Sequence, residues 1–426
     1  MKVLIIGSGG REHALGWKIA QSRKVSKIYI APGNGGTELE PALTNVNIEA
    51  NNIRQLLEFA IENKIDLTIV GPEDPLVNGI TDIFQENGLK CFGPSKAASQ
   101  LEGSKGFMKD FLNRHDIPTA KYEVFHSFFE AKKYIETLKP PIVIKADGLA
   151  AGKGVTVALT LEEAIKAADD ALNKKIFGDS GNRIVVEEFL EGEEASFIVL
   201  TDGEKVIPFA SSQDHKCRDE NDKGPNTGGM GAYSPAPIVS EKIYSKVIED
   251  VIYPTINGLK KEGIKYCGFL YAGLMISPSE EIKVLEYNCR FGDPETQPIM
   301  MRLETDLAEL CLKACSGELI EKHLEWKEEV ALGVVMASEG YPGNYDKGKS
   351  ITGIGIERND FKVFHAGTTL ENGKLKTSGG RVLCVTVLGE DIVSAQKKVY
   401  QETGKIAWEG SFYRKDIGQK AIYRKP

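Results

Sequence analysis

Two oxygen-bearing side chains near residue 286 have the spacing of a cation site. The stretch EYNCRFGDPET, residues 286–296, follows the apolar run IKVL. Alternate residues of a β-strand share a face, so Glu286 and Asn288 are predicted to project together. A carboxylate beside a neutral oxygen suits Mg²⁺ that bridges phosphate oxygens, because water molecules complete its octahedron. The same alternation places Ile282 and Val284 on this face, and Lys283, Leu285 and Tyr287 on the other.

Arg290 lies two residues beyond Asn288 and would point the same way if the strand continued. Its planar guanidinium can bind a phosphate or a carboxylate through paired hydrogen bonds. The alternative is an ion pair between Glu286 and a lysine at a sheet edge. That alternative leaves Asn288 and the segment RFGDPE unexplained, so we prefer the metal interpretation.

A glycine-rich loop with two lysines occupies KADGLAAGKGV, residues 145–155. It does not match the phosphate-binding loop GxxxxGK[ST], because its glycines are spaced too closely, Gly154 replaces the hydroxyl residue, and a strand follows instead of a helix. The remaining interpretation is a flexible loop, with Lys145 before it and Lys153 within it, that folds over a triphosphate. The alternative is an ordinary hairpin turn, which seldom needs so many small residues and two lysines.

The segment GSGGREHA, residues 7–14, follows the first predicted strand and opens the first helix. Its backbone N–H groups could bind a phosphate. A dinucleotide fold also needs an acid at the end of the second strand, but that strand ends in APGN, so NAD is not favoured. A tight turn without a ligand is the alternative. However, APGN and GPEDPL (71–76) end two further strands, and three polar strand ends at one sheet edge favour a small anionic ligand.

A long polar segment, DHKCRDENDKGPNTGGMGAYSP, spans residues 214–235 between an apolar strand and an apolar helix. A segment of this length in a compact chain is either disordered or a working loop. Its NTGG residues, 226–229, offer neutral donors without bulk, which suits phosphate or ribose oxygens. His215 is expected to be solvated, which is the default for a lone histidine.

Composition narrows the class of protein. The chain has 426 residues and a net charge of −8, with no basic tract that could neutralise successive phosphates of a nucleic acid. Its seven cysteines form no CxxC pair and are expected to be reduced core thiols. No apolar run is long enough for a signal peptide or a membrane helix, so we expect a cytoplasmic protein.

Hydrophobic periodicity predicts the elements that must position these residues. From residue 1 to about 100, short apolar runs alternate with helical periods, which is typical of a parallel sheet wound with helices. Two capping boxes, Ser127 with Glu130 and Thr160 with Glu163, predict helices beside a small antiparallel sheet. A long helix is predicted near 240–261. From about 330 the chain is mostly β, with strands expected at ALGVVMAS, SITGIGI, KVFHAGTTL and RVLCVTVLG.

Several of these motifs, in this order, resemble the ATP-grasp superfamily: the lysine before a glycine loop, VVEEFLEGEEASF and LEYNCRFGDPE. With GSGGREHAL, HKCRDENDKGPNTGGMGAYSPAP and RFGDPETQP added, the chain is similar from end to end to the phosphoribosylamine-glycine ligase family, or glycinamide ribonucleotide synthetases. The resemblance implies a multidomain α/β and α+β protein with an ATP-grasp fold. Its four parts would be an N-terminal parallel α/β domain (1–103), a central domain (104–120 and 191–325), a lid subdomain (121–190) and a β-rich C-terminal domain (326–426).

The resemblance also implies a nucleotide site. Lys105 and Lys145 would contact the phosphates, Glu187 would accept a hydrogen bond from the adenine amino group, and Glu194 would bind the ribose hydroxyls. The other implied nucleotide contacts are Gly148, Gly152, Lys153, Gly154, Phe189 and Leu190. Mg²⁺ or Mn²⁺ would bind Glu286 and Asn288, whereas the preceding strand FLYAGLMIS offers no further acid of the kind that many superfamily members supply.

The implied reaction belongs to de novo purine biosynthesis. The glycine carboxylate attacks the γ-phosphate of ATP, and the amine of 5-phosphoribosylamine attacks the resulting glycyl phosphate, which releases glycinamide ribonucleotide, ADP and phosphate. Arg290 and Lys145 are assigned to catalysis, as is Asp214, which would hold the glycine ammonium. The remaining substrate contacts are predicted to be Gly9, Gly10, Arg11, Glu12, Asn34, Glu73, Asp74, Lys216, Asn226, Thr227, Gly228 and Gly229.

The expected partners are therefore small molecules, with neither nucleic acid nor membrane, and the chain is expected to be a monomer. Three alternatives remain. Another ATP-grasp ligase, such as a carboxylase or a formate-using synthetase, should differ in the loop 214–234. A nucleotide-sensing module would bind ATP without turnover, and an NAD oxidoreductase would change nicotinamide absorbance.

Overall fold

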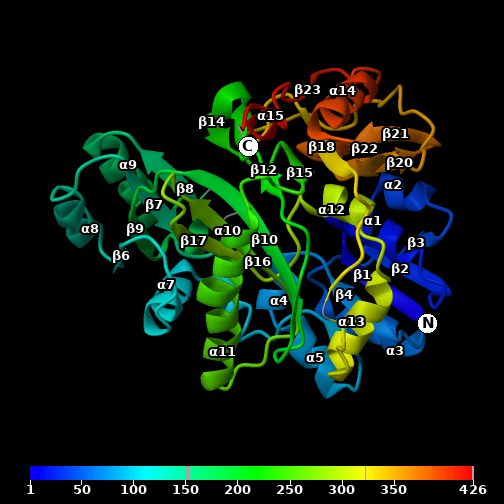
Figure 1. Ribbon diagram of the computed structural model, residues 1–426, viewed down its shortest axis with the longest axis horizontal. Coiled ribbons are helices and arrows are strands. Elements are labelled where there is room, and N and C mark those ends of the chain that lie inside the picture. Colours follow the sequence, from blue (N-terminus) through cyan, green and yellow to red (C-terminus); the bar gives the residue numbers. More distant parts are fainter. Residues whose placement is uncertain (150–153, 322, 425–426) are drawn as a thin grey trace.

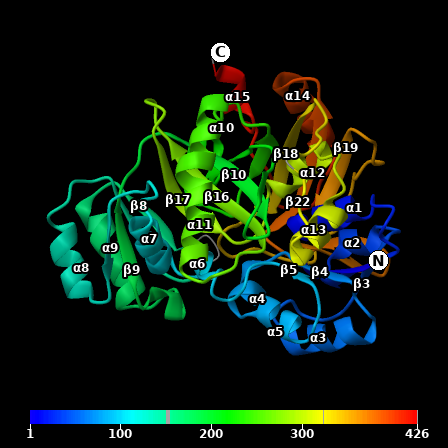
Figure 2. The same ribbon diagram turned by 60° about the horizontal axis from the view of Figure 1, so that its bottom comes forward.

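The computed structural model describes residues 1–149, 154–321 and 323–424. Four sheets and two small hairpins organise the described chain. In Figure 1 the sheet built from residues 122–188 lies on the left, and the N-terminal and C-terminal sheets lie on the right, with the central sheet between. The turned view keeps this separation (Figure 2). A parallel α/β unit beside antiparallel units confirms the predicted fold class.

The N-terminal sheet is parallel, with the order β3-β2-β1-β4-β5. Its strands are β1 (Lys2–Gly7), β2 (Lys27–Pro32), β3 (Leu43–Asn45), β4 (Leu67–Val70) and β5 (Cys91–Phe92). The helices are α1 (Gly10–Ile19), α2 (Gly35–Leu39), α3 (Ile53–Glu62), α4 (Glu73–Val77) and α5 (Ile80–Glu86), followed by α6 (Gln100–Gly103) and α7 (Lys105–Arg114). Residues 3–6 are fully buried, as expected for a strand covered on both faces. The short strand β3 and the short helices α2, α4 and α6 were not predicted from the sequence.

The lid sheet is antiparallel, with the order β6-β9-β7-β8. It comprises β6 (Tyr122–Phe125), β7 (Ile142–Ala146), β8 (Val155–Ala158) and β9 (Ile184–Glu188), with helices α8 (Phe128–Ile135) and α9 (Leu161–Leu172). Both helices begin where the capping boxes predicted. The Thr160 hydroxyl accepts from the Glu163 N–H at 3.1 Å, but the Glu163 carboxylate accepts from Leu159 instead, and Ser127 makes no side-chain cap bond.

The central sheet is antiparallel, with the order β11-β10-β16-β17. Its strands are β10 (Glu193–Thr201), β11 (Val206–Pro208), β16 (Gly268–Ile276) and β17 (Ile282–Asn288). The predicted long helix is present as α10 (Glu241–Val247), one π-helical segment (Ile248–Ile252) and α11 (Tyr253–Lys261). This helix packs its apolar side chains against one face of the sheet (Figure 1).

A bulge in β17 changes the predicted faces of that strand. Gly273 pairs with Glu286 and Leu274 pairs with Val284, so β17 carries one extra residue at this point. Val284 and Tyr287 are therefore both buried on the helix-covered face. The predicted face shared by Ile282, Val284, Glu286 and Asn288 was wrong, because a shift of one residue inverts the alternation.

The C-terminal sheet recruits two strands from the polar segment 214–235 and its flank. Its order is β12-β15-β18-β22-β19, and β23 pairs with β18. The strands are β12 (Gln213–Asp214), β15 (Gly231–Ser234), β18 (Val330–Ser338), β19 (Phe361–His365), β22 (Arg381–Gly389) and β23 (Ser411–Phe412). Between β12 and β15 the segment forms the hairpin β13 (Cys217–Asp219) and β14 (Lys223–Asn226). Residues 213–234 therefore share a sheet with strands of the C-terminal unit.

Further elements complete the C-terminal half. They are α12 (Thr296–Arg302), α13 (Leu307–Ser316), the hairpin β20 (Thr368–Glu371) and β21 (Lys374–Thr377), α14 (Ile392–Thr403) and α15 (Gln419–Tyr423). KVFHAGTTL is thus divided between β19 and β20. The strand predicted at SITGIGI was wrong, because residues 350–356, all of them described, make only isolated bridges.

A buried polar network joins the N-terminal and C-terminal units. Lys362, 2% exposed, pairs with both Glu40 and Glu357 at 2.5 Å. His13 accepts a hydrogen bond from the His365 N–H through Nδ1, so its Nε2 carries the proton that is shared with Glu40 at 3.1 Å. Burial opposes ionisation of Glu40, but the hydrogen bonds from His13 and Lys362 lower its pKa to about 2.

We predict that Lys362→Met destabilises the protein, because it leaves the partly buried Glu40 carboxylate without its cation. The thermal midpoint at pH 7 should fall by roughly 5 °C. Since the pKa of Glu40 is lowered from 4.5 to about 2, the stabilisation is present above pH 4.5 and is lost as the pH falls toward 2. The difference in thermal midpoint between the parent and Lys362→Met should therefore shrink as the pH falls from 4.5 toward 2. The half-exposed pair of Lys376 with Glu371 provides the control, and Lys376→Met should change little.

Candidate active site

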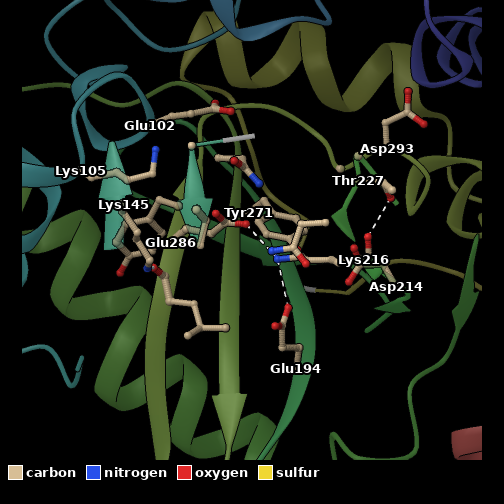
Figure 3. A pocket seen from close by; sticks show the side chains of 18 of the residues that line it. Glu102, Lys105, Lys145, Glu194, Asp214, Lys216, Thr227, Tyr271, Glu286 and Asp293 are labelled. Carbon is tan, nitrogen blue, oxygen red and sulfur yellow. Dashed lines mark hydrogen bonds and ion pairs between the residues drawn. The ribbon is translucent and has the colours of Figure 1, made fainter. Parts of the chain in front are cut away.

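A cavity of about 530 Å³ lies where the four units meet. The N-terminal unit contributes Arg11 and Glu73, the lid contributes Lys145, and the central strands contribute Tyr271 and Glu286. The C-terminal unit adds Tyr341 and Arg381. Figure 3 shows the acidic and basic side chains of this cavity facing one another.

Glu286 and Asn288 both line the cavity at the end of β17. The Nζ of Lys216 lies 3.0 Å from Glu286 and 3.1 Å from Glu194, so the ammonium group sits between two carboxylates (Figure 3). This lysine is the largest cause that lowers the pKa of Glu286 to about 2. The ion pair that the sequence offered as an alternative is therefore present, and it holds Glu286 ionised.

The amide of Asn288 completes a donor set that fits a divalent cation. With its nitrogen directed toward the main chain of Tyr287 and the Glu102 carboxylate, at 3.2 and 3.0 Å, its oxygen is left for another ligand. No group of three His, Cys, Asp or Glu side chains that could hold a metal occurs in the described ranges. Two protein oxygens are enough for a cation that also binds phosphate and water.

Lys145 is held in place by Glu187 and by the main chain of β17. Its Nζ lies 3.0 Å from the Glu187 carboxylate and donates to the carbonyl of Leu285 at 3.1 Å. Lys109, which is fully buried, binds the same carboxylate at 3.0 Å. Two lysines therefore hold the Glu187 carboxylate, but its Oε1 accepts no hydrogen bond from the described residues, so acceptance from the adenine amino group stays a prediction. Neither Lys109 nor its contact was anticipated.

The remaining nucleotide residues divide into three groups. Lys105, Gly154, Phe189, Leu190 and Glu194 line the cavity. The carbonyl of Gly148 accepts a hydrogen bond from Lys105 at 3.3 Å. A side chain at this glycine would come within 2.6 Å of the Ser180 hydroxyl, so Gly148 is required for packing. Gly152 and Lys153 lie outside the described residues.

Arg290 connects β17 to the N-terminal unit. Its guanidinium lies 3.2 Å from Glu73 and 2.9 Å from Glu102. Burial raises the pKa of Glu102 to about 7, against the effect of Arg290. Burial also opposes ionisation of Glu73, but Arg290 and Arg11 lower its pKa to about 2. Glu102 was missed because it lies in a short helix with no local signal.

Asp214 lies in a buried acidic group within the cavity. It is 8% exposed, and Glu295 is 3% exposed. The Ser196 hydroxyl donates to Glu295 at 2.8 Å and contacts the Tyr271 hydroxyl at 3.0 Å. Neither Asp214 nor Glu295 has an ion-pair partner among the described residues, and burial and the charge of Glu295 raise the pKa of Asp214. Two buried acids without a cation favour a cationic ligand.

The predicted phosphate donors at the two glycine segments are already occupied. The Gly9 N–H binds Glu12 at 2.6 Å, and the Arg11 N–H lies 3.4 Å from Asp293. The Gly228 N–H binds the Tyr341 hydroxyl at 2.9 Å, and the Gly229 N–H binds Thr227 at 3.0 Å. These four donors bind side chains of the protein, so a substrate phosphate would have to displace those side chains to reach them, and the predicted contact stays a prediction.

Glu12 also fills the N-terminal sheet edge that a dinucleotide would need. A side chain added at Gly71 would meet its carboxylate oxygen at 2.1 Å, and one at Gly7 would meet its Cγ at 2.5 Å. A Cβ added at Gly10 would likewise lie 2.5 Å from the side-chain nitrogen of Gln297. Buried side chains therefore occupy this edge, which agrees with the sequence argument against NAD.

Three residues singled out in the sequence lie outside the described lining of the cavity. The Asn34 side chain caps α2 and donates to the carbonyls of Ser8 and His365, both at 2.8 Å, so its amide has a structural role. Asp74 is exposed and is absent from the described lining of the cavity. The expectation that His215 is solvated was wrong, because it is only 1% exposed and its ring packs against Tyr233.

Comparison with protein families agrees with this geometry. The chain matches the phosphoribosylglycinamide synthetase N domain at residues 1–102, its ATP-grasp (A) domain at 103–296 and its C domain at 331–420. The chain belongs to the phosphoribosylglycinamide synthetase family. The resemblance seen in the sequence is thereby confirmed.

Curated relatives and solved structures support the same family membership. The chain is 58% identical over 426 residues to phosphoribosylamine–glycine ligase of Haemophilus influenzae, which covers 100% of this chain and 99% of the relative. It is 59% identical to the enzyme of that name from Escherichia coli K12, with the same coverage. The crystal structure of phosphoribosylamine–glycine ligase from Thermotoga maritima has a TM-score of 0.86 at 35% identity and covers 98% of this chain and 100% of that one. Biotin carboxylase from Campylobacter jejuni, at 16% identity and a TM-score of 0.76, covers 99% of this chain and 95% of its own, and shares the fold alone.

None of the described helices is long and apolar enough to cross a membrane.

The described residues include seven free cysteines, and five of these are buried. This agrees with the prediction of core thiols.

We predict that Glu187→Gln weakens nucleotide binding without changing the choice of base. The substitution removes the charge that fixes Lys145 and Lys109, so the KM for ATP should rise about 10- to 100-fold. The ratio of the KM values for ATP and ITP should not change, because these bases differ at the position of the adenine amino group. If that ratio collapses instead, Glu187 reads the amino group as the sequence first implied.

Proposed function

We infer that this chain is an ATP-dependent ligase that joins glycine to 5-phosphoribosylamine and yields glycinamide ribonucleotide, ADP and phosphate for purine biosynthesis. Family membership over the whole length supports this function. The observation that carries it is the single cavity in which lysines for a nucleotide, Glu286 with Asn288 for a cation, and Arg290 lie together.

The nucleotide would bind between the lid and the central sheet. Lys105 and Lys145 would contact its phosphates, Glu194 its ribose, and the main chain near Phe189 and Leu190 its base. A divalent cation, Mg²⁺ or Mn²⁺, held by Glu286 and Asn288 would neutralise phosphate charge. Lys216 would then exchange its contact with Glu286 for a phosphate oxygen.

Glycine would bind beside Arg290, between the nucleotide and the acidic group. The guanidinium would orient the glycine carboxylate or the transferring phosphoryl group, and Asp214 with Glu295 would hold the ammonium group. Because both acids are buried, their attraction for an ammonium group exceeds that of an exposed acid. This pairing would place the carboxylate oxygen toward the γ-phosphate.

The acceptor amine would approach from the side of Arg11, Glu73 and Thr227, which line the other end of the cavity. The reaction then needs no protein nucleophile. Positioning of the two substrates, neutralisation of charge and exclusion of water from an acyl phosphate are sufficient.

Three further points are part of the proposal: the monomeric state, the cytoplasmic location and the boundaries of the four domains. Light scattering, microscopy of the tagged chain and limited proteolysis would test them in turn.

We predict that Glu286→Ala and Arg290→Ala each reduce turnover by at least about 100-fold, because the first removes a ligand of the divalent cation and the second removes a positive charge, and both cations would stabilise the transferring phosphoryl group. Product formation from ATP, glycine and phosphoribosylamine is the measurement, and circular dichroism checks that each variant is folded. Glu280→Ala, which removes a half-exposed acid that pairs with Lys242 and is absent from the described lining of the cavity, is the control and should be active. Full activity of either site variant would remove its assigned role.

The dependence of phosphate release on both substrates tests the function as a whole. A ligase should release phosphate from ATP only when glycine and phosphoribosylamine are both present. Nucleotide binding without such release would instead favour a nucleotide sensor. Release that depends on bicarbonate or formate would favour a different ATP-grasp ligase.

A further inference from the structure

The acceptor end of the cavity must bind a phosphate dianion if the proposed substrate is correct. Four backbone N–H groups there already bind Glu12, Asp293, Tyr341 and Thr227. A buried dianion needs at least one positively charged partner. The cations that line this end are therefore the candidates.

Three arginines line this end of the cavity, and they differ in how well their charges are compensated. Arg11 lies 2.5 Å from the Glu12 carboxylate. Arg290 is held between two carboxylates, at 2.9 and 3.2 Å. For Arg381 the nearest carboxylate in the described chain belongs to Asp293, at 3.5 Å. Arg381 is thus the arginine whose charge is least neutralised by the protein.

Arg381 is also held rigidly. It begins β22, and one terminal nitrogen donates to the carbonyls of Asp293 and Gly228, at 2.6 and 2.7 Å. Neutral carbonyls fix the guanidinium without cancelling its charge. Its Nε makes no hydrogen bond within the described ranges, so one side of the guanidinium can still bind a ligand.

The position of Arg381 brings the predicted anion-binding segments together. Asp293 contacts the start of α1 through the Arg11 N–H, and Gly228 belongs to the loop 226–229. Tyr341 holds the same loop through the Gly228 N–H. The tyrosine ring fits there because Gly380 lacks a side chain, and an added Cβ would lie 2.3 Å from the ring.

We propose that Arg381 binds the phosphate group of the phosphoribosylamine substrate, so that the C-terminal unit provides the anion-binding residue of the acceptor site. This inference rests on the proposed function. It explains how the loop 226–229 and the start of α1 can lie at a phosphate site although their own N–H groups are occupied. It also gives the C-terminal unit a direct part in substrate selection.

The test compares ribose 5-phosphate with ribose as stable probes of the acceptor site. The affinity of each is measured by calorimetry on the full-length chain, without turnover. Arg381→Met should weaken binding of ribose 5-phosphate about 10- to 100-fold, as expected for the loss of charge-assisted hydrogen bonds, and leave ribose unchanged. The affinity of Arg381→Lys for ribose 5-phosphate should lie between the affinities of the parent and of Arg381→Met, because lysine retains the charge but loses the planar fork.

Two control variants separate phosphate binding from general loosening of the loop. Tyr341→Phe removes the hydroxyl that holds Gly228 but keeps the Arg381 charge, so the ratio of the two affinities should be preserved. Arg358→Met removes an exposed arginine of the same unit, bound to Asp360 and Glu402, and should have no effect.

Unchanged binding of ribose 5-phosphate by Arg381→Met would overturn the inference. An equal loss of ribose binding by Arg381→Met would also overturn it in favour of a purely structural role. The same conclusion would follow if Tyr341→Phe reduced the ratio of the affinities for ribose 5-phosphate and ribose as much as Arg381→Met does. Because binding is measured directly, failure of the parent to form product would count against the proposed function and not against the phosphate contact.

Discussion

The central constraint on this protein is that its cavity gathers many charges, some of them buried, so each charge must face an opposite one. Lys216 lies between Glu194 and Glu286, and Arg290 lies between Glu73 and Glu102. A buried charge left alone would cost several kcal/mol. These pairs therefore fix the elements that carry them, and Arg290 in particular fastens the end of β17 to helices of the N-terminal unit. The same groups can exchange partners when charged substrates arrive.

This arrangement explains why the chain needs no nucleophile. Phosphoryl transfer to a carboxylate is limited by the repulsion of negative groups and by their orientation, and both are met by cations fixed in advance. The protein holds those cations ready by pairing them with its own acids. The uncompensated pair of Asp214 and Glu295 is the exception, and a cationic substrate group would provide the missing charge.

The sequence predicted the parallel N-terminal sheet, the lid sheet with its two helices, and the position of Glu286 and Asn288 at the end of a strand, because each depends on local periodicity or spacing. Even there, the bulge in β17 changed which neighbours share a face, since a bulge leaves no local signal. Glu102, Glu295 and Arg381 could not be found, because their roles arise from contacts between segments far apart in the chain. The occupied donors at Gly9 and Gly228 show the same limit. A glycine loop reveals that the backbone can be approached, but not whether a side chain of the protein approaches it first.

The central claim is that Lys216 occupies a cation position that a divalent ion and phosphates take over. A crystal structure with Mn²⁺ and a non-hydrolysable ATP analogue tests this most directly, because manganese is located by its anomalous signal. The account predicts the ion on the Glu286 carboxylate and the Asn288 amide oxygen, with the Lys216 ammonium moved from Glu286 to a phosphate oxygen. An ion bound elsewhere, with the pair of Lys216 and Glu286 intact beside a bound nucleotide, would contradict it.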